Sequence, residues 1–223
     1  MKGKLIIFEG PDFSGKSTQI KLLKPALIKN NSLLYTREPG SFLPDSQEYC
    51  EEIRNFILSN NLTPEQEAAL FAESRFAHTQ EMIKYINEGY NIVCDRYIVS
   101  SLAYQGYAQG IGKDRIYEFN RATVDLLEKN AVPIYCFKSC ISESNWKKRK
   151  AERLQKENAD SIEQKDIHDK VFEFYNSFYI YYTYTHGLNM FTHNVDSNGS
   201  IEEIHKDIVK NIKLAENYNL DVL

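Results

Sequence analysis

Apolar residues along the chain gather in five short runs, separated by longer stretches of mixed character. The runs span Lys4–Glu9, Leu33–Thr36, Asn91–Asp95, Pro133–Phe137 and Met190–Val195. In most of them the apolar residues are consecutive and do not alternate with polar ones, which is typical of parallel strands covered on both faces. The chain is therefore expected to form a five-stranded parallel sheet with helices on either side.

Helical periodicity fills the stretches between these runs. Apolar residues recur three or four positions apart in Ser17–Lys29, Pro64–Asn87, Asp114–Lys129 and Ile201–Asn217. Thr63 is a suitable N-cap for the second stretch, because Pro64 follows it at the first helical position. The alternation of strands and helices predicts a doubly wound α/β fold with right-handed crossovers, and residues 1–223 are expected to form one domain.

Two segments interrupt this alternation. Asn145–Asp160 is polar and rich in charges of both signs, which indicates a solvated helix. Phe172–Tyr184 holds many of the 15 tyrosines and is interpreted as one helix that packs its aromatic side chains, with no chemical role.

Composition narrows the class of protein. Of the 223 residues, 42% are hydrophobic and 26% are charged, as in a globular protein that can bury a core. The net charge of −4 argues against a surface that coats nucleic acid. No apolar stretch approaches the roughly 18 residues of a membrane span, and the Leu5–Phe8 run is too short for a signal peptide. The four cysteines are scattered without a CxxC pair, so free thiols and a cytoplasmic location are expected.

The strongest local signal lies between the first strand and the first helix. Residues 10–17 read GPDFSGKS, which fits the GxxxxGK[ST] pattern of a phosphate-binding loop. The two glycines permit backbone angles that bring successive N–H groups towards phosphates at the positive end of the following helix. Lys16 would place its charge on the β and γ phosphates, and Ser17 would offer a hydroxyl to Mg²⁺. The sequence therefore predicts binding of a nucleoside triphosphate along Gly10, Pro11, Asp12, Phe13, Ser14, Gly15, Lys16, Ser17 and Thr18.

Residues at the end of the third strand indicate which class of nucleotide enzyme this is. Asp95 is followed by Arg96-Tyr97-Ile98, without the glycine of a GTPase DxxG switch, and the chain has no NKxD motif. A carboxylate at this position can hold the shell of Mg²⁺. The adjacent Arg96 guanidinium is suited to a second phosphate. This pair favours a kinase that acts on a phosphorylated acceptor.

Several motifs, in order along the chain, resemble the thymidylate kinase family of nucleoside monophosphate kinases. They are FEGPDFSGKST (8–18), TREPG (36–40), LFAESR (70–75), DRY (95–97), SSLAYQG (100–106) and a segment ending in DSIE (160–163). The resemblance implies a P-loop kinase fold with a small helical lid at about residues 145–163. It also implies transfer from ATP, with Mg²⁺, to dTMP, and a homodimer.

The resemblance further implies roles for individual residues. Asp12 matches the acidic residue that contacts the 3′-hydroxyl of the acceptor, and a carboxylate is a good acceptor for such a hydroxyl. Phe71 matches an aromatic that stacks on thymine, and Arg75, four residues later on the same helical face, matches the arginine that bonds the base. The remaining acceptor residues implied in this way are Arg37, Arg96, Ser101, Tyr104 and Gln105, and the base of ATP is placed near Asp196–Asn198.

The lid departs from the family pattern. Members supply a transition-state arginine from the phosphate loop or from the lid, and here the loop position holds Phe13. The candidates are therefore Arg149 and Arg153, four residues apart on one helical face. Ser161 stands where the family often has an arginine before the glutamate at 163.

Three functions stay open on the sequence alone. The first is thymidylate kinase. The second keeps the chemistry but uses a different or broader range of acceptors, because Ser41 and Phe42 replace the residues that usually follow TREPG. The third is a nucleotide-binding protein without transfer activity, which Ser161 motivates.

Overall fold

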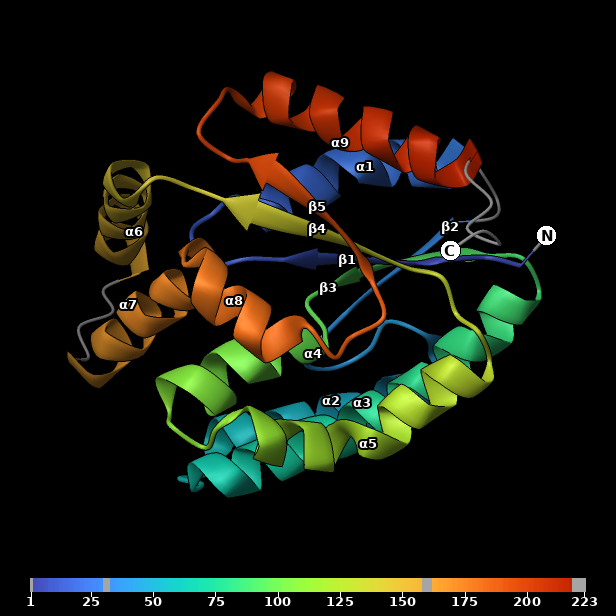
Figure 1. Cartoon of the computed structure of the whole chain (residues 1–223), viewed down its shortest axis with the longest axis horizontal. Coiled ribbons are helices and arrows are strands. Elements are labelled where there is room, and N and C mark those ends of the chain that lie inside the picture. Colours follow the sequence, from blue (N-terminus) through green and yellow to red (C-terminus); the bar gives the residue numbers. More distant parts are fainter. Residues whose placement is uncertain (1, 30–32, 158–161, 218–223) are drawn as a thin grey trace.

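A computed structural model describes residues 2–29, 33–157 and 162–217, and it confirms the predicted parallel sheet (Figure 1). Within these residues five strands pair in the order β2-β3-β1-β4-β5, all parallel. The strands are β1 Leu5–Glu9, β2 Leu33–Arg37, β3 Asn91–Asp95, β4 Ile134–Cys140 and β5 Phe191–Asp196. Each lies within a few residues of its predicted run.

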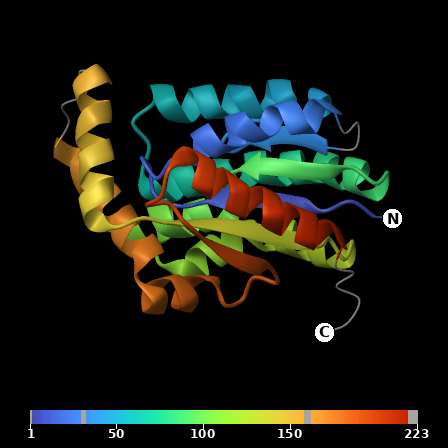
Figure 2. The same cartoon turned by 90° about the horizontal axis from the view of Figure 1, so that it is seen from above.

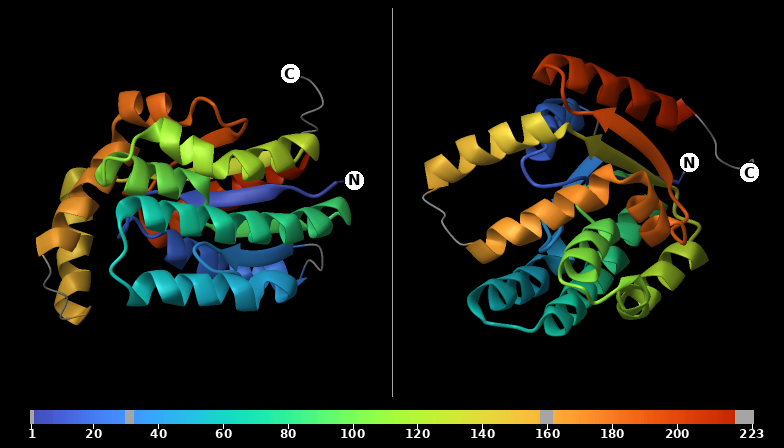
Figure 3. Two further views of the ribbon diagram at one scale, coloured as in Figure 1. Left: turned by 90° about the horizontal axis from the view of Figure 1, so that it is seen from below. Right: turned by 60° about the vertical axis from the view of Figure 1, so that its left-hand side comes forward.

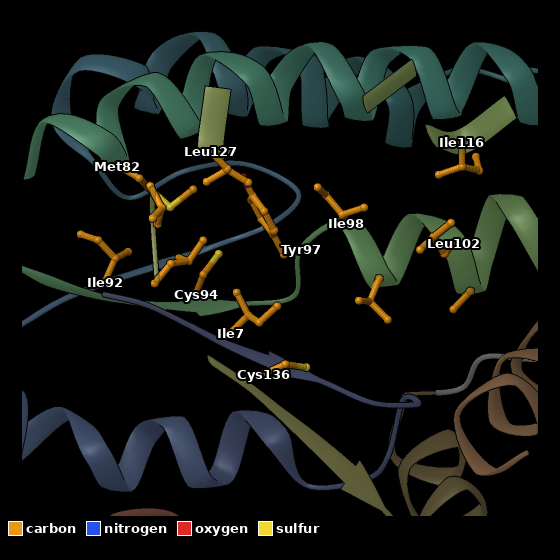
Figure 4. Packing of buried hydrophobic residues seen from close by; sticks show 14 of the residues in the cluster. Ile7, Met82, Ile92, Cys94, Tyr97, Ile98, Leu102, Ile116, Leu127 and Cys136 are labelled. Atoms are coloured by element: carbon orange, nitrogen blue, oxygen red, sulfur yellow. The ribbon is translucent and has the colours of Figure 1, made fainter. Parts of the chain in front are cut away.

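Helices cover both faces of the sheet, which explains the consecutive apolar residues in the strands. In β1, Leu5 and Ile7 face one core cluster and Ile6 and Phe8 face the other. Figure 4 shows the first cluster, between the sheet and the helices that follow β2 and β3. Residues on both sides of the strand thus avoid water, so a polar residue at any of these positions would be costly. The helices are α1 Lys16–Lys29, α2 Pro44–Ser59, α3 Pro64–Asn87, α4 Ile98–Ser101, a π-helix η1 Leu102–Ala108, α5 Lys113–Lys129, α6 Glu143–Glu157, α7 Ile162–Asn176, α8 Phe178–Thr185 and α9 Ile201–Asn217.

The prediction of one helix over Phe172–Tyr184 is wrong. The segment contains the end of α7 and most of α8, and the break falls at Ser177, whose hydroxyl accepts a hydrogen bond from the N–H of Ile180 at 3.3 Å. In α7, Phe174 and Tyr175 are fully buried, whereas in α8 Phe178 is 81% exposed and Tyr181 is buried. An N-capping serine between two aromatic runs therefore ends one helix and begins another.

The strand order brings the candidate chemistry to one end of the molecule. β1 lies between β3 and β4, so its carboxyl end meets that of β3 at the centre of the sheet. Helices α6 and α7 lie side by side beyond these carboxyl ends (Figures 2 and 3). In open parallel sheets, ligands bind in the crevice outside the carboxyl ends of the strands. The site is therefore expected between this edge and α6 and α7.

Two further expectations concern membranes and cysteines. Across the residues that the structure describes, no helix is both long and apolar enough to cross a membrane. Cys50, Cys94 and Cys136 are buried, Cys140 is partly buried, and none of them forms a disulfide within the described part of the chain.

The predicted N-cap of α3 provides a test of local stability. Thr63 Oγ1 accepts from the Gln66 N–H at 3.3 Å, and the Gln66 side chain accepts from the Thr63 N–H at 2.9 Å. Replacing Thr63 with alanine should lower the free energy of unfolding by about 1 kcal/mol, because one N–H at the helix start loses its partner. Urea unfolding followed by circular dichroism measures this. Thr63→Ser, which keeps the hydroxyl, is the matched control, and equal stability of both variants with the wild type would contradict the cap.

Candidate active site

The phosphate loop connects β1 to α1 in a conformation that depends on its glycines. Gly10 has φ 149° and Gly15 has φ 96°, values that favour glycine. A Cβ on Gly10 would also lie 2.8 Å from the Cβ of Ser139, too close for any larger residue. Phe13 adopts φ 65° without being glycine, which costs energy that its surroundings must offset. The predicted loop is thus confirmed in its strand and helix context.

Lys16 lies at the start of α1 with its side chain folded back into the loop. Its Nζ donates to the carbonyl oxygens of Gly10 at 2.9 Å and Pro11 at 2.8 Å. Burial, and then the positive charge of Arg96, lower the pKa of Lys16 to about 7, although Asp12 opposes this. A phosphate group arriving in the loop would favour the charged form again.

Ser17 and Asp95 form a pair suited to a divalent cation. Ser17 Oγ donates to Asp95 Oδ2 at 3.5 Å, across the edge between α1 and β3. Asp95 Oδ1 is buried and has no hydrogen-bond partner among the described residues. A hydroxyl beside a carboxylate oxygen that lacks a donor fits Mg²⁺, which binds oxygen ligands and usually retains waters and substrate phosphates. The residues predicted from the sequence to hold the metal therefore lie together.

Arg96 and Asp12 meet next to the loop. The Arg96 guanidinium donates to Asp12 Oδ1, to the Gly10 carbonyl oxygen at 3.3 Å and to Ser100 Oγ at 3.1 Å. Tyr104, from η1, donates its hydroxyl to Asp12 Oδ2, and its ring lies under the Arg96 guanidinium. Burial opposes ionisation of Asp12, but Arg96 and further donors outweigh it and hold the pKa of this carboxyl well below its usual range. The cluster therefore carries a fixed negative charge beside two cations.

Arg75 belongs to a buried network below this cluster. Its Nε donates to Glu38 Oε2 at 2.5 Å, and its terminal nitrogens donate to Asn120 Oδ1 at 2.7 Å and Ser101 Oγ at 3.1 Å. Arg75 is only 4% exposed, so it is not a surface residue. Phe71, one helical turn earlier in α3, is half-buried, and Gln105 is buried in η1. The structure brings Arg75 and Ser101 together, while their roles in binding the acceptor stay predictions.

Arg37, at the end of β2, is held by residues that the sequence did not associate with it. One of its terminal nitrogens lies 2.9 Å from both carboxylate oxygens of Glu51 in α2. The guanidinium also lies 4.7 Å from the centre of the Phe42 ring. Phe42, which departs from the family pattern, thus orients one of the predicted phosphate-binding arginines.

The two lid arginines differ in exposure. Arg149 in α6 donates to the Ser14 carbonyl oxygen at 3.0 Å and to the Ser197 carbonyl oxygen at 2.8 Å, so it bridges the phosphate loop and the loop after β5. Arg153 is exposed, one turn further along α6. Asp160 and Ser161 lie outside the described residues, and residue 163 is described only as part of helix α7.

Four residues near the site were not predicted: Glu9, Tyr175, Trp146 and His168. The Glu9 carboxylate accepts from the N–H of Tyr97 at 2.7 Å and from the Tyr175 hydroxyl at 2.7 Å. Trp146 Nε1 donates to the main-chain oxygen of Asp12 at 2.8 Å, and His168 lies beside its carboxylate. Glu9 directly precedes the loop and could have been found there, whereas the other three come from distant helices.

A cavity of about 910 Å³ lies at the opposite end of the sheet. It is lined where strands begin, by residues that include Lys4, Asn91, Ile134 and Phe191. None of the predicted site residues lines it. Because the residues that can bind phosphate lie at the carboxyl ends, the candidate active site is the loop and its surroundings.

Comparisons with known proteins show which proteins this chain is similar to. A sequence model described as thymidylate kinase matches residues 8–208. Thymidylate kinase from Bacillus licheniformis is 43% identical over 140 residues, which cover 60% of this chain and 63% of the relative. That of Clostridium novyi is 42% identical over 129 residues, covering 56% of this chain and 60% of the relative. The crystal structure of thymidylate kinase from Ehrlichia chaffeensis has a TM-score of 0.64 at 24% identity, covering 96% of this chain and 100% of that chain, and shows the same fold.

Proposed function

Because the chain belongs to the thymidylate kinase family, we propose that it transfers the γ-phosphoryl group of ATP to dTMP, giving dTDP and ADP. The resemblance inferred from the motifs is confirmed. The matched segments span less than two thirds of the length of the similar proteins, 63% and 60% in the two cases given above. The proposed transfer from ATP to dTMP must therefore also be supported by the geometry of the site.

One observation carries the proposal: two cations converge on one atom. Lys16 Nζ and the Arg96 guanidinium both donate to the carbonyl oxygen of Gly10, at 2.9 and 3.3 Å. Two like charges this close repel each other, and the Asp12 carboxylate paired with Arg96 compensates only one of them. Phosphates bound by the loop and by Arg96 would lie next to each other, as direct transfer between them requires. A protein that only bound ATP would not need the second cation.

The residues around the loop have distinct roles in ATP binding and phosphoryl transfer. Gly10 to Thr18 cradle the ATP phosphates, and Lys16 neutralises charge that builds up during transfer. Ser17 and Asp95 would hold Mg²⁺, which supplies charge neutralisation between the phosphates. Arg149 is the transition-state arginine in this scheme, because its guanidinium already lies 3.0 Å from the Ser14 carbonyl oxygen. Arg153 assists from the same face of α6, and residues 145–163 act as the lid that excludes water.

In the proposed function, residues around Arg96 bind the acceptor. Arg37 and Arg96 contact the phosphate of dTMP, and Asp12 accepts a hydrogen bond from the 3′-hydroxyl. The base lies between Phe71 and η1. The remaining contacts to base and sugar come from Arg75, Ser101, Tyr104 and Gln105. A phosphate monoester has its second pKa near 6, so the acceptor is already a nucleophile at neutral pH and needs no general base.

An acceptor panel tests the proposal. The purified protein, with ATP and Mg²⁺, is assayed for ADP formation with dTMP, dUMP, dCMP and dGMP. We expect kcat/KM for dTMP to exceed that for dUMP by at least about tenfold, the usual effect of one methyl group in a fitted pocket. Equal turnover of several acceptors would favour the broader specificity that the Phe42–Arg37 contact raises. Tight ATP binding without ADP formation from any acceptor would instead favour a binding protein.

A homodimer is also part of the proposal. Tyr49 and Phe56, seven residues apart on one face of α2, are 44% and 52% exposed. Two aromatic side chains at this spacing form an apolar strip that a second copy would cover. Analytical ultracentrifugation of the wild type and of Phe56→Asp tests this. A monomeric wild type would contradict it, as would a variant that dimerises unchanged. A cytoplasmic location stays a prediction.

A further inference from the structure

A histidine of α7, beyond the lid segment 145–163, lies against the phosphate loop. His168 belongs to α7, and its Nδ1 lies 3.1 Å from Asp12 Oδ2. Its ring packs edge-on against Phe13, with the two ring centres 5.3 Å apart. The side chain is only 22% exposed. Two independent contacts, one polar and one aromatic, thus connect α7 to neighbouring residues of the loop.

The Asp12 carboxylate is held from several directions. Arg96 donates to Oδ1, and the Tyr104 hydroxyl donates to Oδ2, the oxygen that also faces His168. Trp146 from α6 fixes the main chain of the same residue through its carbonyl oxygen at 2.8 Å. Partners on both oxygens fix the plane of the carboxylate. A carboxylate has about four lone-pair positions, so a substrate hydroxyl can still be accepted.

The packing of Phe13 gives the histidine a defined position. Phe13 has φ 65°, and its ring contacts both His168 and Trp146, the latter at 6.4 Å between ring centres. Trp146 in turn lies 4.5 Å from the ring of Phe172 in α7. The aromatic residues of α6 and α7 therefore pack over the strained part of the loop, and they set where the His168 imidazole lies relative to Asp12.

We propose that His168 is a positioning residue for the acceptor: it fixes the Asp12 carboxylate so that this group can accept the 3′-hydroxyl of the nucleotide. The inference rests on the proposed function, since it assigns Asp12 to the acceptor sugar. Docking of α7 on the loop then becomes a condition for acceptor binding. ATP binding does not depend on this contact, because Lys16 and the loop amides act on the donor side.

The test separates this role from simple packing by varying both the side chain and the acceptor. His168→Ala, His168→Asn and His168→Gln are compared with dTMP and with 3′-deoxythymidine monophosphate, which lacks the hydroxyl. An asparagine amide can occupy the position of Nδ1, whereas a glutamine amide reaches that of Nε2. His193→Asn is the matched control, because His193 Nε2 lies 2.9 Å from Asp207 Oδ2 in a His–Asp pair between β5 and α9.

For His168→Ala we expect the KM for dTMP to rise roughly tenfold, the usual effect of removing a polar group that contacts a charged one. The KM for 3′-deoxythymidine monophosphate and the KM for ATP should change less than about twofold, because neither substrate places a 3′-hydroxyl on Asp12. His168→Asn should recover most of the dTMP affinity, and His168→Gln should resemble the alanine variant. The control should behave as the wild type.

Equal losses for both acceptors would overturn the proposal, because packing alone acts on the loop as a whole. So would an asparagine variant no better than alanine in a protein whose circular dichroism is unchanged. Calorimetric binding of dTMP and its 3′-deoxy analogue gives the same comparison without transfer. If the wild type binds dTMP but transfers nothing, the kinase proposal fails while this one is still decided by the binding ratios.

Discussion

Replacing Lys16 with methionine should lower the rate of ADP formation by about a hundredfold to a thousandfold, the usual loss on removing one preorganised donor from a transition state. In the structure, Nζ donates to the Gly10 and Pro11 carbonyl oxygens. The bound phosphates would take over these contacts, and the ammonium would then lie where negative charge develops. Methionine has a similar length and fills the same space, so the loop should keep its shape.

The same substitution should leave stability unchanged or raise it, which distinguishes lost chemistry from lost folding. The folded loop lowers the pKa of Lys16 from 10.5 to about 7, so between these values folding opposes protonation of this amine. The resulting cost to stability is fully present below pH 7 and disappears as the pH rises above 10.5. Methionine removes this cost. Thermal unfolding at pH 8 and a steady-state assay provide the two measurements.

Lys21→Met, five residues further along α1 at an exposed position, is the matched control and should retain the wild-type rate. A Lys16→Met protein that keeps more than about a tenth of the rate would contradict the assignment of the loop to the ATP phosphates. A marked fall in its melting temperature would contradict the electrostatic argument instead.

The parts of the site that were predicted from sequence are those fixed by local geometry. Gly10, Gly15 and Lys16 are close in the chain, and a strand and a helix flank them. Asp95 and Arg96 were chosen from their position at the end of the third strand, and they reach the loop because the carboxyl end of β3 is next to that of β1. Neither step needed any knowledge of how helices pack.

The residues that were missed depend on helix packing. Trp146 and His168 are more than a hundred residues from Asp12 in sequence, and they reach it only because α6 and α7 lie across the strand ends. Helix α2 was missed for another reason. Of its buried residues Ser46, Cys50 and Ile57, only the last is a large aliphatic one, so the buried face leaves little apolar periodicity.

Helix η1 shows a further limit of sequence patterns. Of residues 102–108, only Tyr104 and Gln105 were singled out, as acceptor contacts implied by the resemblance. The whole segment forms a π-helical turn, in which the Tyr104 hydroxyl reaches Asp12. Turns with hydrogen bonds between residues five apart are rare in proteins as a whole. Many of those that occur lie at functional sites. The spacing of apolar residues in such a turn matches neither that of a strand nor that of an α-helix, so the sequence pattern does not predict it.

Arg96→Ala should lower kcat/KM for dTMP by about two to three orders of magnitude while changing the dissociation constant of ATP less than about threefold, because a buried anion loses its charged partner. The guanidinium joins Asp12, the Gly10 carbonyl oxygen and Ser100 Oγ, and in the proposed function it contacts the acceptor phosphate. Acceptor kinetics at saturating ATP and calorimetry with ATP measure the two effects. Arg115→Ala is the control, since Arg115 pairs with Glu65 and Glu118 on the surface, away from the loop.

Arg96→Ala removes two functions at once. One is the planar pair of guanidinium N–H donors that binds phosphate, and the other is the positive charge that keeps Asp12 ionised. Arg96→Lys separates them. A lysine keeps a positive charge near Asp12 but offers a point charge in place of a planar fork. If the fork matters, the lysine variant should stay within a few-fold of alanine for dTMP. If charge alone matters, it should recover most of the activity. Equal losses towards ATP and dTMP in the alanine variant would contradict the placement of Arg96 on the acceptor side, because a residue that served only the loop would weaken both substrates together.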